Sequence, residues 1–275
     1  MCAQIVVIQG AATMPETSTP KTVLLTRRQL VAMTGLATAY ALARAAAAAE
    51  VAPESADPAQ PDRSKDHVVN VAIVLGQHNT LIDVAGPWEV LSSAGYSGGA
   101  FNVYSVAASR APVICDDGRG AMDPGMGAFP LSGLTVIPDF TFDSAPQPRV
   151  IVIGAQTSDE SWERRSLEWI RRAAAKAELT ASVCTGAYLL AKSGLLDGKR
   201  ATTNRAAYDD FQKTFPRIQL VRGVRFVAAG SVASATGLSA GIDLALHIVE
   251  RFYGRQVAQH VADYEEWPSA AWRGS

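Results

Sequence analysis

The sequence has 275 residues, of which 48% are hydrophobic and 19% charged, and its formal net charge is −1. This balance is typical of a globular protein, and it gives no reason to expect nucleic acid or a charged membrane surface as a partner. From residue 67 onward about 210 residues remain, which is enough for one domain with a sizeable core. Residues 50–66, rich in Pro, Ala, Asp and Ser, are predicted to be a disordered linker before it.

The N-terminal region has the features of an export signal in the required order. Arg27 and Arg28 precede an apolar run over residues 30–43, and an alanine tract follows at 45–49. The run is shorter than the roughly 20 residues that span a bilayer. We therefore predict a twin-arginine signal peptide over residues 1–49, with the mature protein periplasmic or secreted and free of the membrane. An ordinary N-terminal helix or an uncleaved anchor is the alternative.

Strands and helices are predicted to alternate through residues 67–275. Strands are expected at 68–75, 101–107, 113–115, 134–137, 149–153, 179–183, 200–203, 218–221, 225–229 and 232–235. Helices are expected at 81–91 with Pro87 in its first turn, at 161–178, 187–192 and 208–214, and at 239–252 with a stop at Gly254. Such alternation favours an α/β fold in which helices cover both faces of a parallel sheet.

Residues 179–194 hold the strongest candidate for a reactive group. A strand ends at Cys184 and a helix begins at Ala187, with the small residues Ser182 and Gly186 nearby. This arrangement predicts a nucleophile elbow, in which a sharp turn exposes the side chain to a cleft. The helix N-terminus would favour the thiolate form of the cysteine. The alternative is a buried cysteine that fills space at the end of a strand.

Three turns are expected at the carboxyl edge of the sheet, where ligand sites of such folds lie. They follow the strands that end at residues 75, 153 and 183. We therefore expect Asp83, Gly154 and Cys184 to converge on one cleft. The alternative role for Asp83 is that of a helix N-cap.

The cysteines and histidines provide no metal-binding pattern. Only Cys115 and Cys184 remain once the signal peptide, which contains Cys2, is removed, and a disulfide between them is an alternative to a free nucleophile. There is no CxxC or HExxH motif and no cluster of histidines with carboxylates. The sequence therefore predicts neither a metal nor another cofactor.

Four segments in order resemble the ThiJ/PfpI superfamily, and the resemblance extends over residues 68–267. They are DVAGPWEV at 83–90, VCTG at 183–186, LLDGKRATT at 195–203 and ATGLSAGIDLAL at 235–246. The resemblance implies a flavodoxin-like sandwich related to class I glutamine amidotransferases, and a homodimer. Within the superfamily the chain looks most similar to isonitrile hydratases and to the sensor domain of AraC-type regulators.

The resemblance also assigns roles to single residues. Cys184 matches the family cysteine, and Asp83 matches the acidic residue that isonitrile hydratases place beside it. The N–H groups of Thr185 and of the turn at Gly154 and Ala155 fall where the family stabilises an oxyanion. Many relatives have a second glycine where this chain has Ala155.

One departure bears on the chemistry. Relatives with protease or amidotransferase activity often have a histidine 20 residues after the cysteine, and this chain has Asn204 there. Asparagine cannot take a proton from the thiol, and His78 is the candidate that could replace the histidine in space. Asn204 and His78 are therefore candidate residues of the substrate pocket.

These observations lead to one hypothesis and two alternatives. The hypothesis is an exported cysteine-dependent hydratase or lyase that acts on a small electrophile such as an isonitrile or an aldehyde. Cys184 would attack, and a protonated Asp83 would donate to the sulfur and then shuttle protons. The alternatives are a ligand-binding domain without catalysis, and a redox or stress-protective protein whose Cys184 oxidises to a sulfinate.

Overall fold

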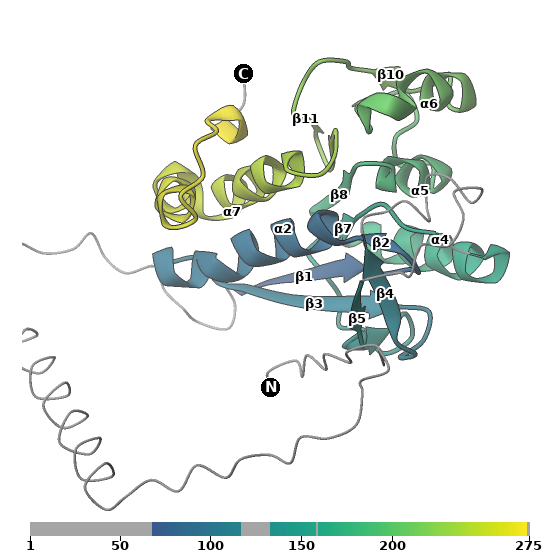
Figure 1. Ribbon diagram of the computed structural model, residues 1–275, viewed down its shortest axis with the longest axis horizontal. Helices are drawn as coiled ribbons and strands as arrows, with labels where there is room; N and C mark the ends of the chain where they lie inside the picture. The colour runs from purple at the N-terminus through teal and green to yellow at the C-terminus, as the bar shows by residue number, and fades with distance from the viewer. Residues whose placement is uncertain (1–67, 117–132, 158, 274–275) are drawn as a thin grey trace, which may run out of the picture. The chain divides into compact units, whose positions relative to one another are not determined.

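A computed structural model describes residues 68–116, 133–157 and 159–273, so the predicted signal peptide and linker lie outside the described residues. A seven-stranded sheet with the order β11-β12-β8-β7-β1-β3-β6 forms the centre (Figure 1). Its strands are Val69–Val74 (β1), Phe101–Ala107 (β3), Phe140–Thr141 (β6), Val150–Ile153 (β7), Leu179–Val183 (β8), Phe226–Ala229 (β11) and Val232–Ala235 (β12). All neighbouring strands are parallel except β11, which is antiparallel to β12. The predicted α/β fold is confirmed.

Helices cover both faces of this sheet. They are Leu81–Ser93 (α2), Glu160–Ala174 (α4), Gly186–Lys192 (α5), Tyr208–Thr214 (α6) and Ala240–Tyr264 (α7), with short 3-10 helices at Ala94–Ser97 (η2), Arg205–Ala207 (η3) and Ala271–Arg273 (η4). Helices α2 and α7 pack together on one face, and α4 and α5 lie on the other (Figure 1). Each face has its own buried apolar cluster.

The central strand β1 shows how the sequence specifies these two layers. Val71 and Ile73 belong to the cluster under α2 and α7, whereas Ala72 and Val74 belong to the cluster under α4 and α5. Successive side chains of a strand point to opposite faces, so a strand covered on both faces must be apolar throughout. The continuous apolar run in the sequence is therefore required by the position of β1 in the middle of the sheet.

One of the helix predictions is corrected by the structure, and another is confirmed. Pro87 lies well inside α2 instead of in its first turn. Because proline has no N–H, the Asp83 carbonyl four residues earlier loses its partner within the helix. The predicted stop at Gly254 is confirmed, because its φ of 85° and ψ of 167° are not helical, so α7 consists of two helices that meet at a kink there.

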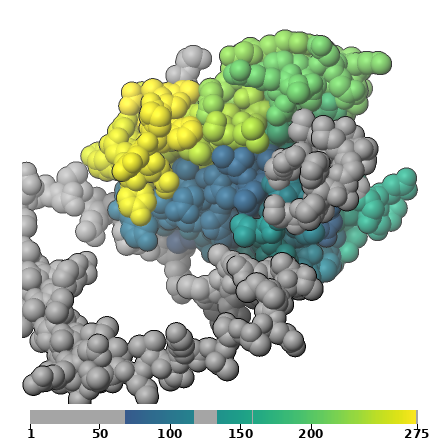
Figure 2. Space-filling view, viewed as in Figure 1, coloured from purple at the N-terminus to yellow at the C-terminus, as the bar shows by residue number. Residues whose placement is uncertain are grey.

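Two small sheets and the C-terminal segment complete the described structure. Asn79–Thr80 (β2), Val113–Asp116 (β4) and Leu134–Val136 (β5) form one small sheet, and Arg200–Ala201 (β9) and Gln219–Leu220 (β10) form the other. Figure 2 shows the C-terminal residues in yellow against the blue region that contains α2. Trp272 of η4 is buried in the apolar cluster under α2 and α7. None of the described helices is long and apolar enough to cross a membrane.

Candidate active site

Cys184 occupies a strained turn between β8 and α5. Its φ is 60°, in the left-handed region, and such a conformation costs a residue other than glycine about 1–3 kcal/mol. Three hydrogen bonds hold the turn: Cys184 donates its N–H to Ala235, and its carbonyl oxygen accepts from Ala187 at 3.3 Å and from the Thr203 hydroxyl at 3.1 Å. The predicted elbow is therefore present, and the surrounding structure fixes its geometry.

Glycine is required two residues after the cysteine. A Cβ at Gly186 would overlap the backbone carbonyl oxygen of Ile153 at the end of β7. The first turn of α5 therefore lies directly on the neighbouring strand. This close approach brings the β8–α5 turn against the turn that follows β7.

Asp83 comes from the first turn of α2 and is completely buried. One carboxyl oxygen accepts the N–H of Ala155 at 3.1 Å, and the other accepts the N–H of Leu238 at 3.0 Å. The carboxyl group also lies within hydrogen-bonding reach of the Cys184 thiol. Asp83 is therefore not an N-cap, because Thr80 holds that position and the carboxyl group bonds to other elements.

The amide of Asn204 provides a second contact to the sulfur. Its Nδ2 donates to Cys184 Sγ at 3.1 Å, while its Oδ1 accepts the N–H of Ala206 at 2.9 Å. The backbone N–H of Thr185 is also directed at the sulfur. The sulfur thus faces a carboxyl group and two N–H donors.

Burial determines the charge state of this group. It raises the pKa of Cys184 to about 11, helped by the negative charge of Asp83 and opposed by the donors Asn204 and Thr185. Burial also raises the pKa of Asp83 to about 6, against the N–H groups of Ala155 and Leu238. At neutral pH the site therefore holds a thiol beside a carboxylate. The raised pKa of Asp83 agrees with the expectation of an acid that can hold a proton beside the cysteine, whereas the expected thiolate is not favoured, because burial outweighs the helix dipole.

The turn after β7 differs from the expected oxyanion site. The N–H of Ala155 already donates to Asp83, so in this state it is not directed at a substrate. A Cβ at Gly154 would lie 3.1 Å from the Asp83 Cβ, which is tighter than an ordinary contact. Gly154 and Ala155 therefore position the carboxyl group, and Thr185 is the member of the predicted set whose N–H faces the sulfur.

A sequence model of the DJ-1/PfpI family matches residues 69–251, which is most of the described structure. The chain belongs to the DJ-1/PfpI family. The predicted ThiJ/PfpI resemblance is confirmed by this match and by the relatives.

The curated relatives of this DJ-1/PfpI protein include both an enzyme and regulators. An isonitrile hydratase of Pseudomonas putida is 33% identical over 182 residues, which cover 66% of this chain and 70% of that protein. The HTH-type transcriptional regulator GbdR of Pseudomonas aeruginosa is 29% identical over 132 residues, or 48% of this chain. The match spans only 36% of the regulator's length.

Solved structures support the DJ-1/PfpI fold. A ThiJ/PfpI family protein from Pseudomonas syringae superimposes with a TM-score of 0.60 and 23% identity, over 77% of this chain and 83% of that chain. An AraC family transcriptional regulator from Pseudomonas putida gives a TM-score of 0.57 with 16% identity, over 72% of this chain and 99% of that one. At these identities the likeness establishes the fold alone.

None of the described histidines of this DJ-1/PfpI chain acts on the Cys184 thiol. The Nδ1 of His78 lies 2.7 Å from the buried carboxylate of Asp116, and His78 is not among the groups that act on the Cys184 thiol. His247 packs on Phe226, and His260 is exposed. Among the described residues, the expected replacement of the missing histidine by His78 does not occur.

Sequence reasoning overlooked the segment that joins β12 to α7. Leu238 donates its N–H to Asp83, and both Gly237 and Leu238 have a positive φ. A Cβ at Gly237 would lie 3.1 Å from both the sulfur of Cys184 and the Nδ2 of Asn204. The signal was the small-residue run Ala-Thr-Gly-Leu-Ser at 235–239, which belongs to the fourth segment of the resemblance but had no assigned role.

Cys115 and Cys184 are both free, and the thiol of Cys115 is buried. The alternative disulfide is therefore absent from the described structure. No group of three or more metal-ligating side chains gathers anywhere in the described ranges.

Proposed function

We propose that this protein is a cysteine-dependent hydratase that adds water to a small isonitrile. The observation that carries the proposal is the position of Asp83 beside Cys184, where a buried carboxyl group lies within hydrogen-bonding reach of the thiol of an elbow cysteine. Two backbone N–H groups hold that carboxylate, so its position does not depend on a histidine. The relationship to an isonitrile hydratase supports the substrate class.

The first step is addition of the thiol across the terminal carbon of the isonitrile. As the sulfur attacks, its proton passes to the Asp83 carboxylate and from there to the same carbon. A sulfur–carbon bond and a carbon–hydrogen bond form, which gives a thioimidate of Cys184. The raised pKa of the thiol makes this coupled transfer necessary, because few molecules hold a free thiolate at neutral pH.

The second step is addition of water to the thioimidate carbon. Asp83 takes a proton from the water, and the imine nitrogen receives one. The carbon–sulfur bond then breaks, the thiol regains its proton, and an N-substituted formamide leaves. The net reaction converts an isonitrile and water into an N-substituted formamide and restores Cys184 and Asp83. The N–H donors of Asn204 and Thr185 stabilise the charge on the departing sulfur.

This chemistry suits the site better than peptide hydrolysis does. Hydration expels no amine, so it needs no strong acid next to a leaving nitrogen. A Cys–His protease supplies that acid as an imidazolium. The described residues place no histidine against the Cys184 sulfur.

The direct test measures formamide production from a small alkyl isonitrile with the wild type and with Cys184→Ala. The variant should lose at least about 10³-fold in kcat while its far-UV circular dichroism and melting temperature are kept. Cys115→Ser is the matched control because its thiol lies outside the site. Formamide production by Cys184→Ala at the wild-type rate would refute the role of the cysteine.

A second candidate function is ligand sensing without turnover. A thiol with a pKa of about 11 is a poor resting nucleophile, and the chain matches a transcriptional regulator over 132 residues. Under this alternative, isonitriles are not hydrated, and a small ligand raises the melting temperature equally in the wild type and Cys184→Ala. The same raised pKa disfavours the redox alternative, since oxidation to sulfinate proceeds through the thiolate.

The proposal includes export by the twin-arginine route. Its support is the order of Arg27, Arg28, the apolar run and the alanine tract in residues 1–49. Replacing both arginines by lysine should keep a tagged chain in the cytoplasm. The wild type should be cleaved near Ala49, which N-terminal sequencing of the exported form would establish. Equal export of both forms would refute this part of the proposal.

A further inference from the structure

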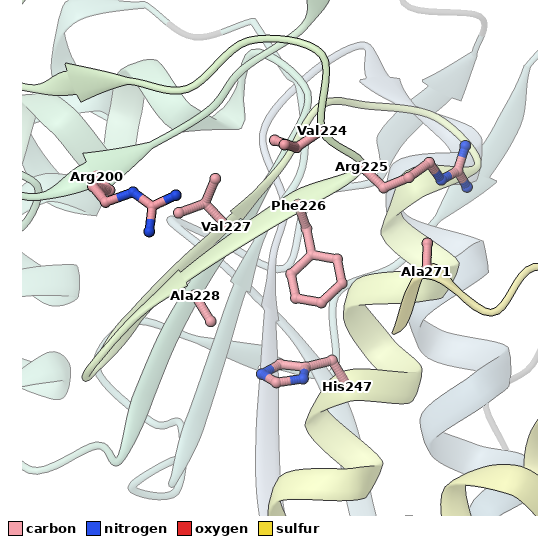
Figure 3. A pocket seen from close by; sticks show the side chains of 8 residues that line it. All are labelled: Arg200, Val224, Arg225, Phe226, Val227, Ala228, His247 and Ala271. Atoms are coloured by element: carbon pink, nitrogen blue, oxygen red, sulfur yellow. The ribbon is translucent and has the colours of Figure 1, made fainter. Parts of the chain in front are cut away.

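A cavity away from Cys184 is lined by β11, the strand at one end of the seven-stranded sheet. Its volume is about 450 Å³, which is in the range of small-molecule sites. Consecutive residues 224–228 form one wall, and Arg200 of β9 and His247 of α7 contribute from either side (Figure 3). Neither Cys184 nor Asp83 lines it.

The two arginines at this cavity differ in how their charges are compensated. The guanidinium of Arg225 is directed away from Arg200 in Figure 3, and it is paired with the buried carboxylate of Asp243, with Nε at 2.7 Å. Asp243 also accepts hydrogen bonds from the side chains of Trp267 and Ser269. Arg200 has no ion-pair partner among the described residues. Within the described part of the chain, the positive charge of Arg200 at this cavity is therefore not compensated by a carboxylate.

Two aromatic rings line the same cavity as Arg200. The centroid of the Phe226 ring is 4.9 Å from that of the His247 ring, and the planes are inclined by 40°. Burial lowers the pKa of His247, so its ring is neutral at pH 7, although Glu250 at 4.0 Å acts in the opposite direction. Phe226 and His247 thus offer an uncharged aromatic surface in the cavity that Arg200 also lines.

An apolar aromatic surface combined with one free guanidinium selects for a particular class of ligand. A planar ring can stack on Phe226 and His247, and a carboxylate attached to it can form a bidentate pair with Arg200. An uncharged ring would leave the guanidinium unpaired, and an aliphatic anion would leave the rings uncovered. We propose that this cavity is a second ligand site that binds a small aromatic carboxylate, separate from the Cys184 site.

The test is a calorimetric titration of the purified protein with sodium benzoate, and with benzamide as the uncharged equivalent. Benzoate should bind one site with a Kd of about 1 mM or tighter. Benzamide should bind at least about tenfold more weakly, because it cannot form the charge-assisted pair. No saturation by benzoate up to about 20 mM, or equal binding of the two compounds, would overturn the proposal.

Variants identify which cavity the benzoate occupies. Arg200→Gln should weaken binding by at least about tenfold, because it removes the charged partner of the carboxylate. Arg217→Gln is the matched control, since Arg217 is an exposed arginine that pairs with Asp197 away from the cavity. Cys184→Ala should bind benzoate as the wild type does. A smaller effect of Arg200→Gln, or loss of binding in Cys184→Ala, would overturn the proposal by placing the ligand elsewhere.

Discussion

The side-chain amide of Asn204 donates to the sulfur of Cys184 at 3.1 Å. The orientation of this amide is fixed from the other side, because its oxygen accepts the N–H of Ala206. Asn204 stands where relatives with protease or amidotransferase activity often have a histidine, yet its contact to the sulfur is direct. It therefore replaces a proton acceptor with a donor that stabilises negative charge on sulfur.

Asn204→Ala should raise the pKa of Cys184 further, because the thiolate loses a charge-assisted hydrogen bond. One pKa unit corresponds to about 1.4 kcal/mol, so a shift of about one unit is expected. The pKa is measured from the pH dependence of iodoacetamide alkylation, followed on the Cys184 peptide by mass spectrometry. Asn102→Ala, which removes an exposed amide far from the sulfur in the chain, is the control. An unchanged or lowered pKa would contradict the role of Asn204.

Asp83→Asn should separate thiol reactivity from turnover. Because the negative charge of Asp83 raises the pKa of Cys184, its removal should lower that pKa and speed alkylation at pH 8. Isonitrile hydration should nevertheless fall by about 10²-fold or more, since the proton carrier is lost. Both rates are measured on the same preparation. A variant that alkylates faster and also hydrates faster would show that Asp83 only restrains the thiol.

Asp83 should also make the stability of the fold depend on pH. Its folded pKa of about 6 lies above the ordinary aspartate value of 3.8, so the folded state binds the proton more tightly than the unfolded chain. The contribution of Asp83 to the free energy of unfolding therefore falls by about 3 kcal/mol in total as the pH rises from about 4 to about 6. Above that pH the contribution is constant.

The measurement compares urea denaturation of the wild type and Asp83→Asn between pH 4 and pH 8. Other carboxylates contribute equally to both proteins, so the difference between the two curves isolates Asp83. The wild type should lose stability relative to the variant as pH rises through this window. A difference that is constant with pH would mean that the Asp83 pKa is not raised.

The sequence was sufficient to predict where Cys184 and Asp83 meet. Both follow apolar strands, and the carboxyl ends of parallel strands share one edge of the sheet. Residue types and spacing carry this information, so the elbow and the order of strands and helices could be predicted with small errors at the ends. Pro87 was misjudged because packing between α2 and α7 sustains the helix through a residue that would break an isolated one, whereas the stop at Gly254 was predicted correctly.

The charge state of the site could not be predicted in the same way. The pKa of Cys184 depends on how completely distant elements cover the thiol. The local sequence predicted a lowered pKa, because it shows only the helix dipole. The N–H donors to Asp83 come from residues 72 and 155 positions away along the chain. No spacing rule connects Asp83 with Leu238, so that contact required the folded structure.

Gly186→Ala tests whether the elbow depends on the contact between α5 and β7. The added methyl would overlap the Ile153 carbonyl oxygen, which is backbone and cannot rotate away. The turn would have to move off β7, so we expect a loss of about 3 kcal/mol or more in the free energy of unfolding. The sulfur of Cys184 would shift away from Asp83, and hydration should fall along with stability.

Gly95→Ala is the matched control for this substitution, because a Cβ there would meet no atom within 4 Å. It should change the free energy of unfolding by less than about 1 kcal/mol and leave hydration unchanged. Chemical denaturation and isonitrile turnover are measured for both variants. If Gly186→Ala were as stable and as active as Gly95→Ala, the contact of α5 with the β7 carbonyl could not be what holds the cysteine turn in place.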